Sequence, residues 1–408
     1  SLDQLAGTRN ELKELLPAGT IPDSMWHYVP ERFVLRGKLT GSKEQLLPDL
    51  VLNSSYGTVT IKGRLDHPTD VNRADYDLVV SARNLDLARV LMDTAYGLVT
   101  GQAKMKGHGF DLPTMKAHAE LSVDEAYYNQ YTYQGVKVQA DTDHGSSAAT
   151  IHANDPNVDM DSDIRLRYDK SVKDLYIDAD IRELDLHSLR LSDSIMVLKG
   201  RIHADFPNLD SGHVVGNGMI RDLQLQMGRN VLQLDTLTLT GTDSLDVQTL
   251  SLRSDLADAE LKGHYSIRAI PEAAKTIMDN WLTKEGAPKP FDESILAMLK
   301  ADVHIPDSNA WVIPGLQKLA PFQLTAVINS DLNQLGLVTN IPYITYQGYT
   351  MDSLRIGLLQ DNTREERRKA NYEVEVSRFS TPNFATNAVS LSGDINKGEV
   401  SADLKLMD

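Results

Sequence analysis

The chain of 408 residues contains no cysteine at all. This absence excludes disulfide bonds, zinc–thiolate sites and thiol nucleophiles, and it fits either a cytoplasmic or a periplasmic location. Aromatic residues are also scarce, at 6% of the chain, so the apolar content consists mostly of leucine, valine, isoleucine and alanine. Aliphatic side chains suit a long, narrow interior better than a globular one.

Basic residues are in deficit, with 41 lysines and arginines against 57 aspartates and glutamates, which gives a formal net charge of -16. Because binding to nucleic acid needs clustered basic residues, this composition argues against a nucleic-acid partner. The acidic residues are spread along the chain and therefore predict a solubilising outer surface. Hydrophobic residues make up 41% and charged residues 24%, which is typical of a folded protein.

Long apolar runs are missing as well. No stretch approaches the ~18–20 apolar residues that a membrane-spanning helix needs. The first residues, Ser1 to Gln4, lack an initiator methionine, a basic segment and an apolar segment, so no export signal is recognisable there. We therefore expect this sequence to be a piece of a longer protein, with any membrane anchor or export signal outside it.

Catalytic motifs are absent. The sequence contains no H-E-x-x-H, no G-x-S-x-G, no G-x-x-x-x-G-K-[ST] and no G-x-G-x-x-G that opens a helix. Its 11 histidines are scattered. For each of them, a partly exposed position on a strand is a better interpretation than a metal ligand or a general base. The sequence thus predicts a protein that is not an enzyme, with no catalytic residue and no cofactor.

One acidic cluster deserves comparison with a metal site. Asp155, Asp159, Asp161 and Asp163 resemble the start of a calcium loop, but Ile164 stands where such a loop needs glycine. On a strand, the last three carboxylates share one face, which is acceptable only where that face is solvated. A solvated face is therefore the favoured interpretation and a bound cation the alternative.

The mixed-charge run from Arg364 to Lys369 predicts a solvated hairpin tip. A contact with a membrane surface is the alternative interpretation of its basic residues.

From Arg32 onward, apolar and polar residues alternate with a period of two. Between Leu175 and Arg182, for example, every second residue is aliphatic. Such runs predict strands with one apolar and one polar face, and short turns rich in glycine, proline and asparagine separate them. Amphipathic helices, which a parallel β–α–β arrangement would need, are not evident between Arg32 and Arg268. The pattern predicts antiparallel strands.

A repeat supports this prediction. The segment 83–87, Arg-Asn-Leu-Asp-Leu, is echoed by the segment 182–186, Arg-Glu-Leu-Asp-Leu (182 − 83 = 99), and Gly101 is echoed by Gly200 at the same offset. An imperfect third copy places Tyr372 to Arg378 beside Tyr76 to Arg83. Repeated units of this kind stack on one another and rarely build a catalytic pocket.

Helices are predicted in two places. Leucines at near-helical spacing predict a helix over the first sixteen or so residues, and the segment 1–31 then comprises this helix and a linker. The alternation of apolar and polar residues is interrupted between Pro271 and Pro321. There, Glu272 to Leu282 predicts one helix and Asp292 to Lys300 a second, joined by residues 287–290.

The expected fold is therefore mainly β, an elongated repetitive antiparallel sheet curled into a trough like a β-taco or solenoid. The predicted organisation is an N-terminal helix and linker at 1–31, a repetitive trough at 32–268, a helical insertion at 269–320 and a continuation of the trough at 321–408. The insertion could cover one opening of the array or separate two sub-arrays, and the sequence does not distinguish these.

An apolar sheet face must be covered by a second sheet, by curling, or by an apolar ligand. A core filled with protein is one interpretation, and a groove for lipid acyl chains is the other, because acyl chains need aliphatic walls and no directional polar contacts. Alternation alone predicts inward, groove-lining positions at Val136, Val138, Leu175, Ile177, Leu232, Leu234, Leu237, Leu239, Leu250 and Leu252.

The glycine-led alternating strands, the Leu-Asp-Leu turns at 85–87 and 184–186 and the hairpin strand 131–138 resemble the AsmA-like superfamily, in particular its TamB-like (translocation and assembly module) members. The likeness covers residues 32–268 and 321–408 and consists of repeat texture. A membrane anchor, a C-terminal barrel-docking domain and a counterpart of the 271–300 helices are not recognised.

The resemblance implies a periplasmic envelope protein of diderm bacteria that is anchored at the inner membrane and has a trough with an aliphatic interior. It further implies a part in outer-membrane biogenesis, with phospholipid acyl chains as the partner and an outer-membrane barrel protein as a second candidate partner. The leading hypothesis is thus a non-enzymatic segment that conducts phospholipid between the two membranes. A scaffold that pairs with client β-strands is the alternative, and a carbohydrate-active β-solenoid is a third interpretation.

Overall fold

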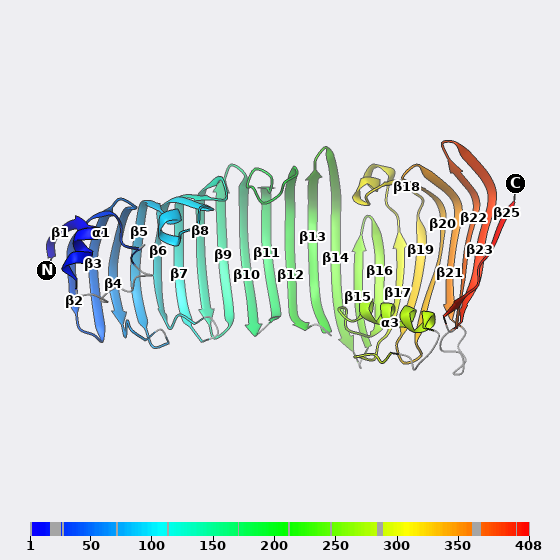
Figure 1. Cartoon of the computed structure of the whole chain (residues 1–408), viewed down its shortest axis with the longest axis horizontal. Coiled ribbons are helices and arrows are strands. Elements are labelled where there is room, and N and C mark those ends of the chain that lie inside the picture. Colours follow the sequence, from blue (N-terminus) through cyan, green and yellow to red (C-terminus); the bar gives the residue numbers. More distant parts are fainter. Residues whose placement is uncertain are drawn as a thin grey trace. The chain divides into compact units, whose positions relative to one another are not determined.

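The computed structural model describes residues 2–16, 26, 28–70, 72–111, 114–169, 171–210, 213–244, 247–283, 289–360, 369–396 and 398–407. These residues fall into two compact units, residues 1–201 with 226–228 and residues 202–225 with 229–408, and each unit is considered by itself. The described residues contain 25 strands in antiparallel sheet (Figure 1). The predicted mainly β class with antiparallel pairing is therefore confirmed.

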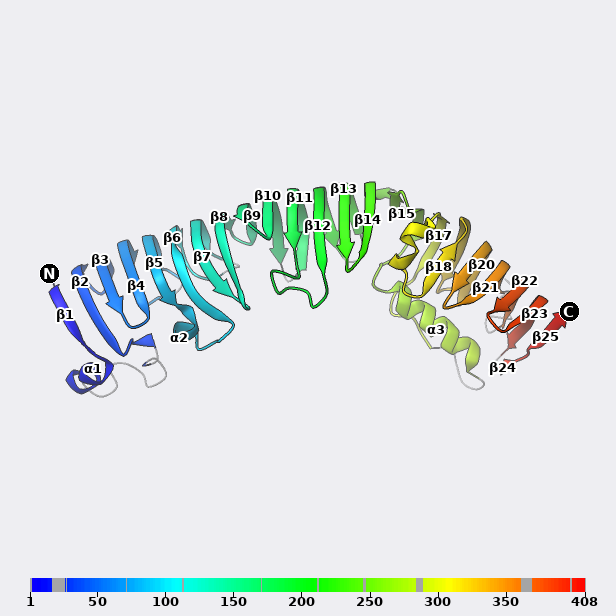
Figure 2. The same cartoon turned by 90° about the horizontal axis from the view of Figure 1, so that it is seen from above.

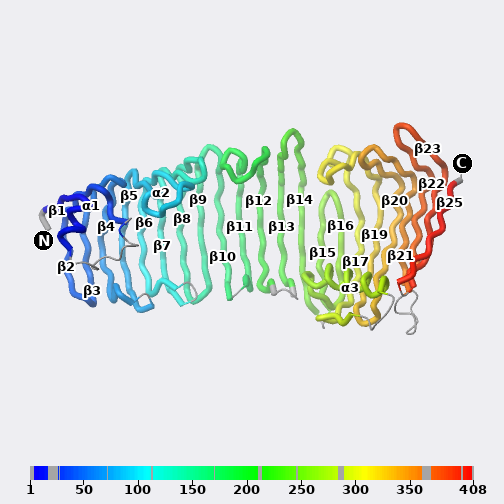
Figure 3. Tube along the Cα trace, in the orientation of Figure 1, coloured from blue at the N-terminus to red at the C-terminus, as the bar shows by residue number. Residues whose placement is uncertain are grey.

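Within the first unit, successive strands lie side by side in chain order, as the trace in Figure 3 also shows. Short turns join them, so nearly every strand pairs with its neighbours in the sequence. The elements are β1 (Leu2–Thr8), α1 (Arg9–Leu15), β2 (Arg32–Gly41), β3 (Gln45–Ser54), β4 (Gly57–Asp66), β5 (Asp75–Asp86), α2 (Leu87–Leu91), β6 (Tyr96–His108), β7 (Lys116–Tyr128), β8 (Tyr131–Asp143), β9 (Ser146–Asp155), β10 (Val158–Asp169) and β11 (Ser171–Asp185).

Two long strands, β12 (Met196–Asp210) and β13 (His213–Met227), contribute residues to both units. The second unit is likewise built of successive antiparallel hairpins, with two helical segments inserted. Its elements are β14 (Asn230–Ser244), β15 (Val247–Ser254), β16 (Ala257–His264), α3 (Ile270–Leu282), β17 (Leu296–Val303), the 3₁₀ helix η2 (Asp307–Val312), β18 (Leu316–Leu319), β19 (Phe322–Asn329), β20 (Gln334–Tyr346), β21 (Tyr349–Gln360), β22 (Lys369–Thr381), β23 (Phe384–Asn396), β24 (Glu399–Val400) and β25 (Asp403–Met407).

Several strands contain a kink at which two consecutive residues point outward. In β5 the pairing register with β6 shifts between Ala82 and Leu85, and Asn84 adopts a positive φ of 49°. In the second unit, Ser353 of β21 (φ 52°) and Ala388 of β23 (φ 40°) have the same backbone conformation. Irregularities of this kind bend a strand and increase its twist. The sheets are therefore bent at these kinks, not flat.

The kinks explain how apolar residues three positions apart can face the same side. Val376 of β22 belongs to a buried cluster of the second unit and Phe379 packs against the same cluster, although the two flank the exposed pair Ser377 and Arg378. A regular strand would place residues with this odd spacing on opposite faces. The predicted groove residues Leu234 and Leu237 have the same spacing across the segment 235–236 of β14.

The sequence repeat falls on these kinks. Arg83 and Asn84 of β5 correspond to Arg182 and Glu183 of β11, where the register with β10 also shifts. The Leu-Asp-Leu turn that follows has one function in both copies: Asp86 Oδ1 accepts a hydrogen bond from the Arg89 amide at 3.3 Å, and Asp185 Oδ1 accepts one from the Ser188 amide at 2.9 Å. Each aspartate thus caps the turn after a kinked strand.

The predicted N-terminal helix is only partly correct. Residues Leu2–Thr8 form strand β1, which pairs with β2, and the helix occupies Arg9–Leu15. A capping box fixes this start, because the Glu11 amide donates to Thr8 Oγ1 at 3.3 Å and the Thr8 amide donates to Glu11 Oε2 at 2.7 Å. The residues before Thr8 pair with the edge of β2. This strand pairing outweighs the helical preference that their leucine spacing indicates.

Of the two helices predicted between Pro271 and Pro321, only the first is found. Helix α3 covers Ile270–Leu282, with Pro271 in its first turn (Figure 2). The second prediction, Asp292 to Lys300, is wrong, because Leu296–Val303 forms strand β17, paired with both β16 and β19. Leu296 and Met298 are exposed apolar residues on the outer face of β17. Because apolar residues occupy both faces of this strand, the sequence does not show the alternation of apolar and polar residues there. The joining segment 287–290 lies partly outside the described residues.

Candidate functional site

Four of the predicted groove residues lie on one face of the first unit. Val138 of β8 is opposite Ile151 of β9, which is opposite Ser162 of β10, and Ser162 is opposite Ala179 of β11. Directly opposed residues of antiparallel strands share a face. Val136, Leu175 and Ile177 join the same face because each is separated from a member of these pairs by an even number of residues along its strand.

This apolar face of the first unit extends over many strands. From β4 to β7, residues of this face are likewise directly opposite one another on adjacent strands. Only aliphatic or small side chains occupy the centre of the face. The members from β4 to β11 include Val59, Ile61, Leu78, Val80, Ala103, Met105, Ala119, Leu121, Val136, Val138, Ala140, Ala149, Ile151, Ile164, Leu175, Ile177 and Ala179.

The centre of this face is not covered by a second layer in the described part of the first unit. Most of its side chains are half-buried, and Leu121 is 41% exposed. The buried apolar cluster found in this unit consists of Ala153, Val158 and Leu189. This cluster lies at one end of the strands, and the predicted groove residue Val136 packs against it, whereas the rest of the aliphatic centre is not part of the cluster.

The alanines on this face were missed by sequence reasoning, which selected only large aliphatic residues. Ala103, Ala119, Ala140 and Ala149 are paired with residues of this face and therefore belong to it. They occupy alternate positions on their strands, so the same period of two would have identified them.

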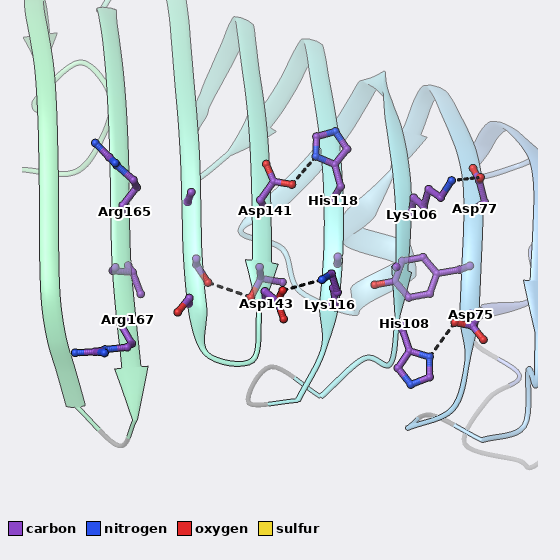
Figure 4. Close-up of a pocket in the computed structure, with 18 of the residues that line it drawn as sticks. Asp75, Asp77, Lys106, His108, Lys116, His118, Asp141, Asp143, Arg165 and Arg167 are labelled. Atoms are coloured by element: carbon purple, nitrogen blue, oxygen red, sulfur yellow. Dashed lines mark hydrogen bonds and ion pairs between the residues drawn. The ribbon is translucent and has the colours of Figure 1, made fainter.

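The opposite face of the same strands is charged. His118 Nδ1 lies 2.7 Å from Asp141 Oδ1, and Lys116 Nζ donates to Asp143 Oδ2 at 2.8 Å (Figure 4). The hydrogen bond and charge of Asp141 raise the pKa of His118. A hollow of about 1180 Å³ lies along these side chains. Its lysines and arginines mostly contact carboxylates, as expected for a solvated face stabilised by cross-strand ion pairs.

Of the four aspartates considered as a calcium site, Asp159, Asp161 and Asp163 belong to this charged face, whereas Asp155 is buried. Arg182 Nε donates to Asp159 Oδ1 at 2.7 Å and Arg182 Nη1 donates to Asp161 Oδ2 at 2.8 Å. Thr150 Oγ1 donates to Asp163 Oδ1 at 2.7 Å. The carboxylates thus have protein partners, and no cluster of three or more metal-ligating side chains occurs among the residues described.

In the second unit, four predicted groove residues share an apolar face. Leu239 is opposite Leu252, and Leu250 is opposite Leu261 of β16. Leu237 lies on the same face as Leu239, two residues along β14. All four predicted residues on this face are half-buried.

Leu232 and Leu234 differ from the other predicted groove residues. Only 7% and 4% of their surfaces are exposed, so they are packed core residues of β14. A charge at Leu234 is therefore expected to unfold the protein locally, and it is unsuitable as a test of ligand binding.

The charged run from Arg364 to Lys369 cannot be placed on this site, since residues 361–368 lie outside the described part of the chain. None of the helices in the described part is long and apolar enough to cross a membrane. In comparisons with protein-family models, curated proteins and solved structures, the chain matches none of them.

Proposed function

We propose that this chain is a non-enzymatic periplasmic segment that shields phospholipid acyl chains on its apolar faces and conducts them between the inner and outer membranes. The observation that carries the proposal is the aliphatic centre of the first unit, which is partly exposed and has no covering layer in the described residues. Water contact with such a surface is unfavourable, whereas each methylene group buried there contributes ~0.8 kcal/mol.

The chemistry of the two faces supports this assignment. The apolar face offers no cluster of charged groups, so it can bind a chain of methylene groups without fixing its position along the strands. The charged face keeps the other side in water through pairs such as Lys104 with Glu120, whose Nζ and Oε2 atoms are 2.9 Å apart. The repeat texture that resembles the TamB-like proteins supports the periplasmic location.

The test is a matched pair of charge substitutions on β8. Val138→Asp places a carboxylate on the apolar face, and Lys137→Asp places one on the adjacent, exposed position of the charged face. Native mass spectrometry and lipid extraction of the protein purified from bacteria are expected to find phospholipid with the wild type and with Lys137→Asp. Val138→Asp is expected to lose most of it while keeping the circular dichroism of a folded sheet.

Wild-type protein that carries no phospholipid, or equal lipid content in both variants, would contradict the proposal. A photo-crosslinking residue at Leu121 gives an independent measurement, because this side chain is 41% exposed on the apolar face. It is expected to label the acyl chains of phospholipid vesicles, in contrast to the same residue at Lys137.

The second candidate function is assembly of outer-membrane barrel proteins by strand pairing. It is favoured by β25, which pairs with β23 alone in the described residues, and by Leu404 and Leu406 on it, which are 60% and 62% exposed. Exposed strand edges accept further strands. Crosslinking of a peptide from the last strand of an outer-membrane barrel to position 406, but not to position 121, would support this function.

A further inference from the structure

In the second unit, one part of the apolar face is uncovered and another part is covered. Leu239 of β14 is opposite Leu252 of β15, which is opposite Ala259 of β16, and all three side chains are half-buried. None of the three belongs to a buried cluster found in the described residues. On β14 and β15 the face therefore has the same aliphatic, partly exposed character as the face of the first unit.

From β16 onward, helix α3 covers this face at one end of the strands (Figure 2). Its residues Ala273, Ile277 and Trp281 form a buried cluster with Ala297 of β17 and Ile328 of β19. Ile277 and Trp281 are 0% and 1% exposed. Half-buried residues of β16, β20, β21 and β23 pack against the same cluster, namely Leu261, Leu335, Leu358 and Ile395. The helix thus lies where a ligand of the apolar face would have to bind.

The 3₁₀ helix η2 covers the opposite end of the same strands. Its residue Ala310 lies in a buried cluster with Ile341 of β20 and Val376 of β22. Thr339, which lies between Leu335 and Ile341 along β20, is only 5% exposed. The walls formed by α3 and η2 therefore close most of this part of the face.

Hydrogen bonds hold α3 in this position as well. Asn280, 1% exposed, donates through Nδ2 to Asn333 Oδ1 at 2.8 Å and accepts from the Lys289 amide at 2.6 Å. Trp281 Nε1 donates to the Asn333 carbonyl at 3.2 Å, and the Trp281 carbonyl accepts from the Gly398 amide at 2.8 Å. Leaving such buried groups without partners costs free energy. The helix is thus fixed on the sheet in this structure.

An acyl chain and α3 would compete for the same surface of the sheet. Both bury aliphatic side chains such as Ile328 and Leu335, and two groups cannot occupy one surface together. A ligand that binds only after the helix has left the sheet has an apparent affinity lowered by the small fraction of molecules in which the surface is free. The covered part of the face is therefore a poor lipid site as long as α3 is docked.

We infer that α3 is an autoinhibitory element, which keeps the apolar face closed from β16 onward. Acyl chains then bind as far as β15 and pass beyond it only where the helix has left the sheet. This inference rests on the proposed lipid-binding function and adds a restriction on where along the chain the lipid binds.

The experiment uses the full chain with an aliphatic diazirine amino acid at Leu121, Leu252 or Leu335, and vesicles of phosphatidylethanolamine and phosphatidylglycerol supply the lipid. Irradiation is expected to label lipid at Leu121 and at Leu252. Labelling at Leu335 is expected to be weaker by about tenfold or more, because only the fraction of molecules with α3 displaced can bind there.

A substitution in α3 gives a second measurement. Trp281→Ala removes the largest buried side chain of the helix and is expected to raise labelling at Leu335 about tenfold, since loss of a buried aromatic side chain weakens the docked arrangement. Labelling at Leu252 is expected to stay unchanged. Met278→Ala is the matched control, because Met278 is 43% exposed on the same helix, and it is expected to leave both signals unchanged.

A reversible lock is available because the chain contains no cysteine. Asn280→Cys combined with Asn333→Cys introduces the only two thiols and removes the contact between the two side chains. Labelling at Leu335 is expected to rise in this double variant and to return to the wild-type level after joining of the thiols with a short bifunctional reagent. A monofunctional thiol reagent is the control and is expected to leave the raised signal unchanged.

The outcomes separate the two proposals. Wild-type labelling at Leu335 that equals labelling at Leu252 overturns autoinhibition by α3 and leaves the proposed function intact, and so does a Leu335 signal that Trp281→Ala leaves unchanged. Absence of lipid labelling at all three positions overturns both proposals. If Trp281→Ala does not fold, the joined and unjoined forms of the cysteine variant and the comparison within the wild type still decide the question.

Discussion

At the scale of single residues, the best-defined polar contact of the first unit is centred on Asp155, which is 4% exposed. Its carboxylate accepts hydrogen bonds from the Tyr131 hydroxyl and from the amides of Gln134 and Asn157, both at 2.8 Å. These contacts connect the turn between β9 and β10 to strand β8. A buried carboxylate with several donors stabilises the fold far more than an exposed ion pair does.

Removing the charge of Asp155 should therefore destabilise the first unit. Asp155→Asn keeps the size of the side chain but replaces one acceptor with a donor, and the expected loss is about 1–3 kcal/mol in the free energy of unfolding. Asp163→Asn is the control, because Asp163 is exposed and its loss should be within about 0.5 kcal/mol. Urea denaturation measures both, and equal losses would contradict the assignment.

Tyr131 should titrate unusually late. Burial, together with the hydrogen bond to Asp155, raises the pKa of Tyr131 to about 12 from 10.0. Because the pKa is higher in the folded state, its contribution to stability is complete below pH 10 and is lost as the pH rises through about 12. Phenolate absorbance of the wild type minus that of Tyr131→Phe should show this late titration. A midpoint near 10 in the difference curve would show that the contact is absent in solution.

At the scale of the element, the kinked strand is the feature that recurs. The sequence repeat of 83–87 and 182–186 falls on the kinks of β5 and β11. Asp185 shows the contact that the two copies of the repeat share, an aspartate that caps the turn after the strand. Burial alone would raise the pKa of Asp185, but hydrogen bonds from Ser188 and His187 outweigh it and lower this pKa. The aspartate remains charged and fixes the turn.

Ala388 gives a direct test of the kink in β23. Its φ of 40° is in the left-handed region, which costs an L-residue about 1–2 kcal/mol. Ala388→Gly should therefore raise the free energy of unfolding by about 0.5–1 kcal/mol, net of the greater freedom of glycine when unfolded. Ala385→Gly on the same strand should instead lower it by about 0.5–1 kcal/mol, because no kink exists there. Equal destabilisation by both substitutions in thermal unfolding would show that β23 is regular.

At the scale of the whole molecule, stability should be distributed among neighbouring strands, as in other repeat proteins. Ile277 of α3 is fully buried in a cluster of the second unit. Ile277→Ala is expected to cost about 2–5 kcal/mol. Hydrogen exchange should show the loss of protection in residues 229–408 and little change before residue 185.

The matched control is Val138→Ala in the first unit, where the side chain is half-buried and the expected effect is smaller and confined to residues before 201. Uniform loss of protection throughout the chain after either substitution would show that the chain unfolds as one cooperative body.

The sequence by itself determined the mainly β class, the antiparallel pairing and the apolar face at Val136, Val138, Leu175 and Ile177. These follow from the period of two and from short turns, which are local properties. It also located helix α3 through Pro271, although it extended the N-terminal helix too far and misread β17 as a helix. Local patterns failed there because β-strand partners distant in sequence determined the conformation.

Only the tertiary structure decided which apolar positions are covered. Leu234 and Leu237 are indistinguishable in the sequence, yet Leu234 is almost fully buried and Leu237 is half-exposed. The walls formed by α3 and η2 likewise depend on contacts between segments that are far apart in the chain, such as Trp281 with Asn333. Alternation specifies the side of a strand on which a residue lies, but the packing of distant elements decides whether that side is filled or left open.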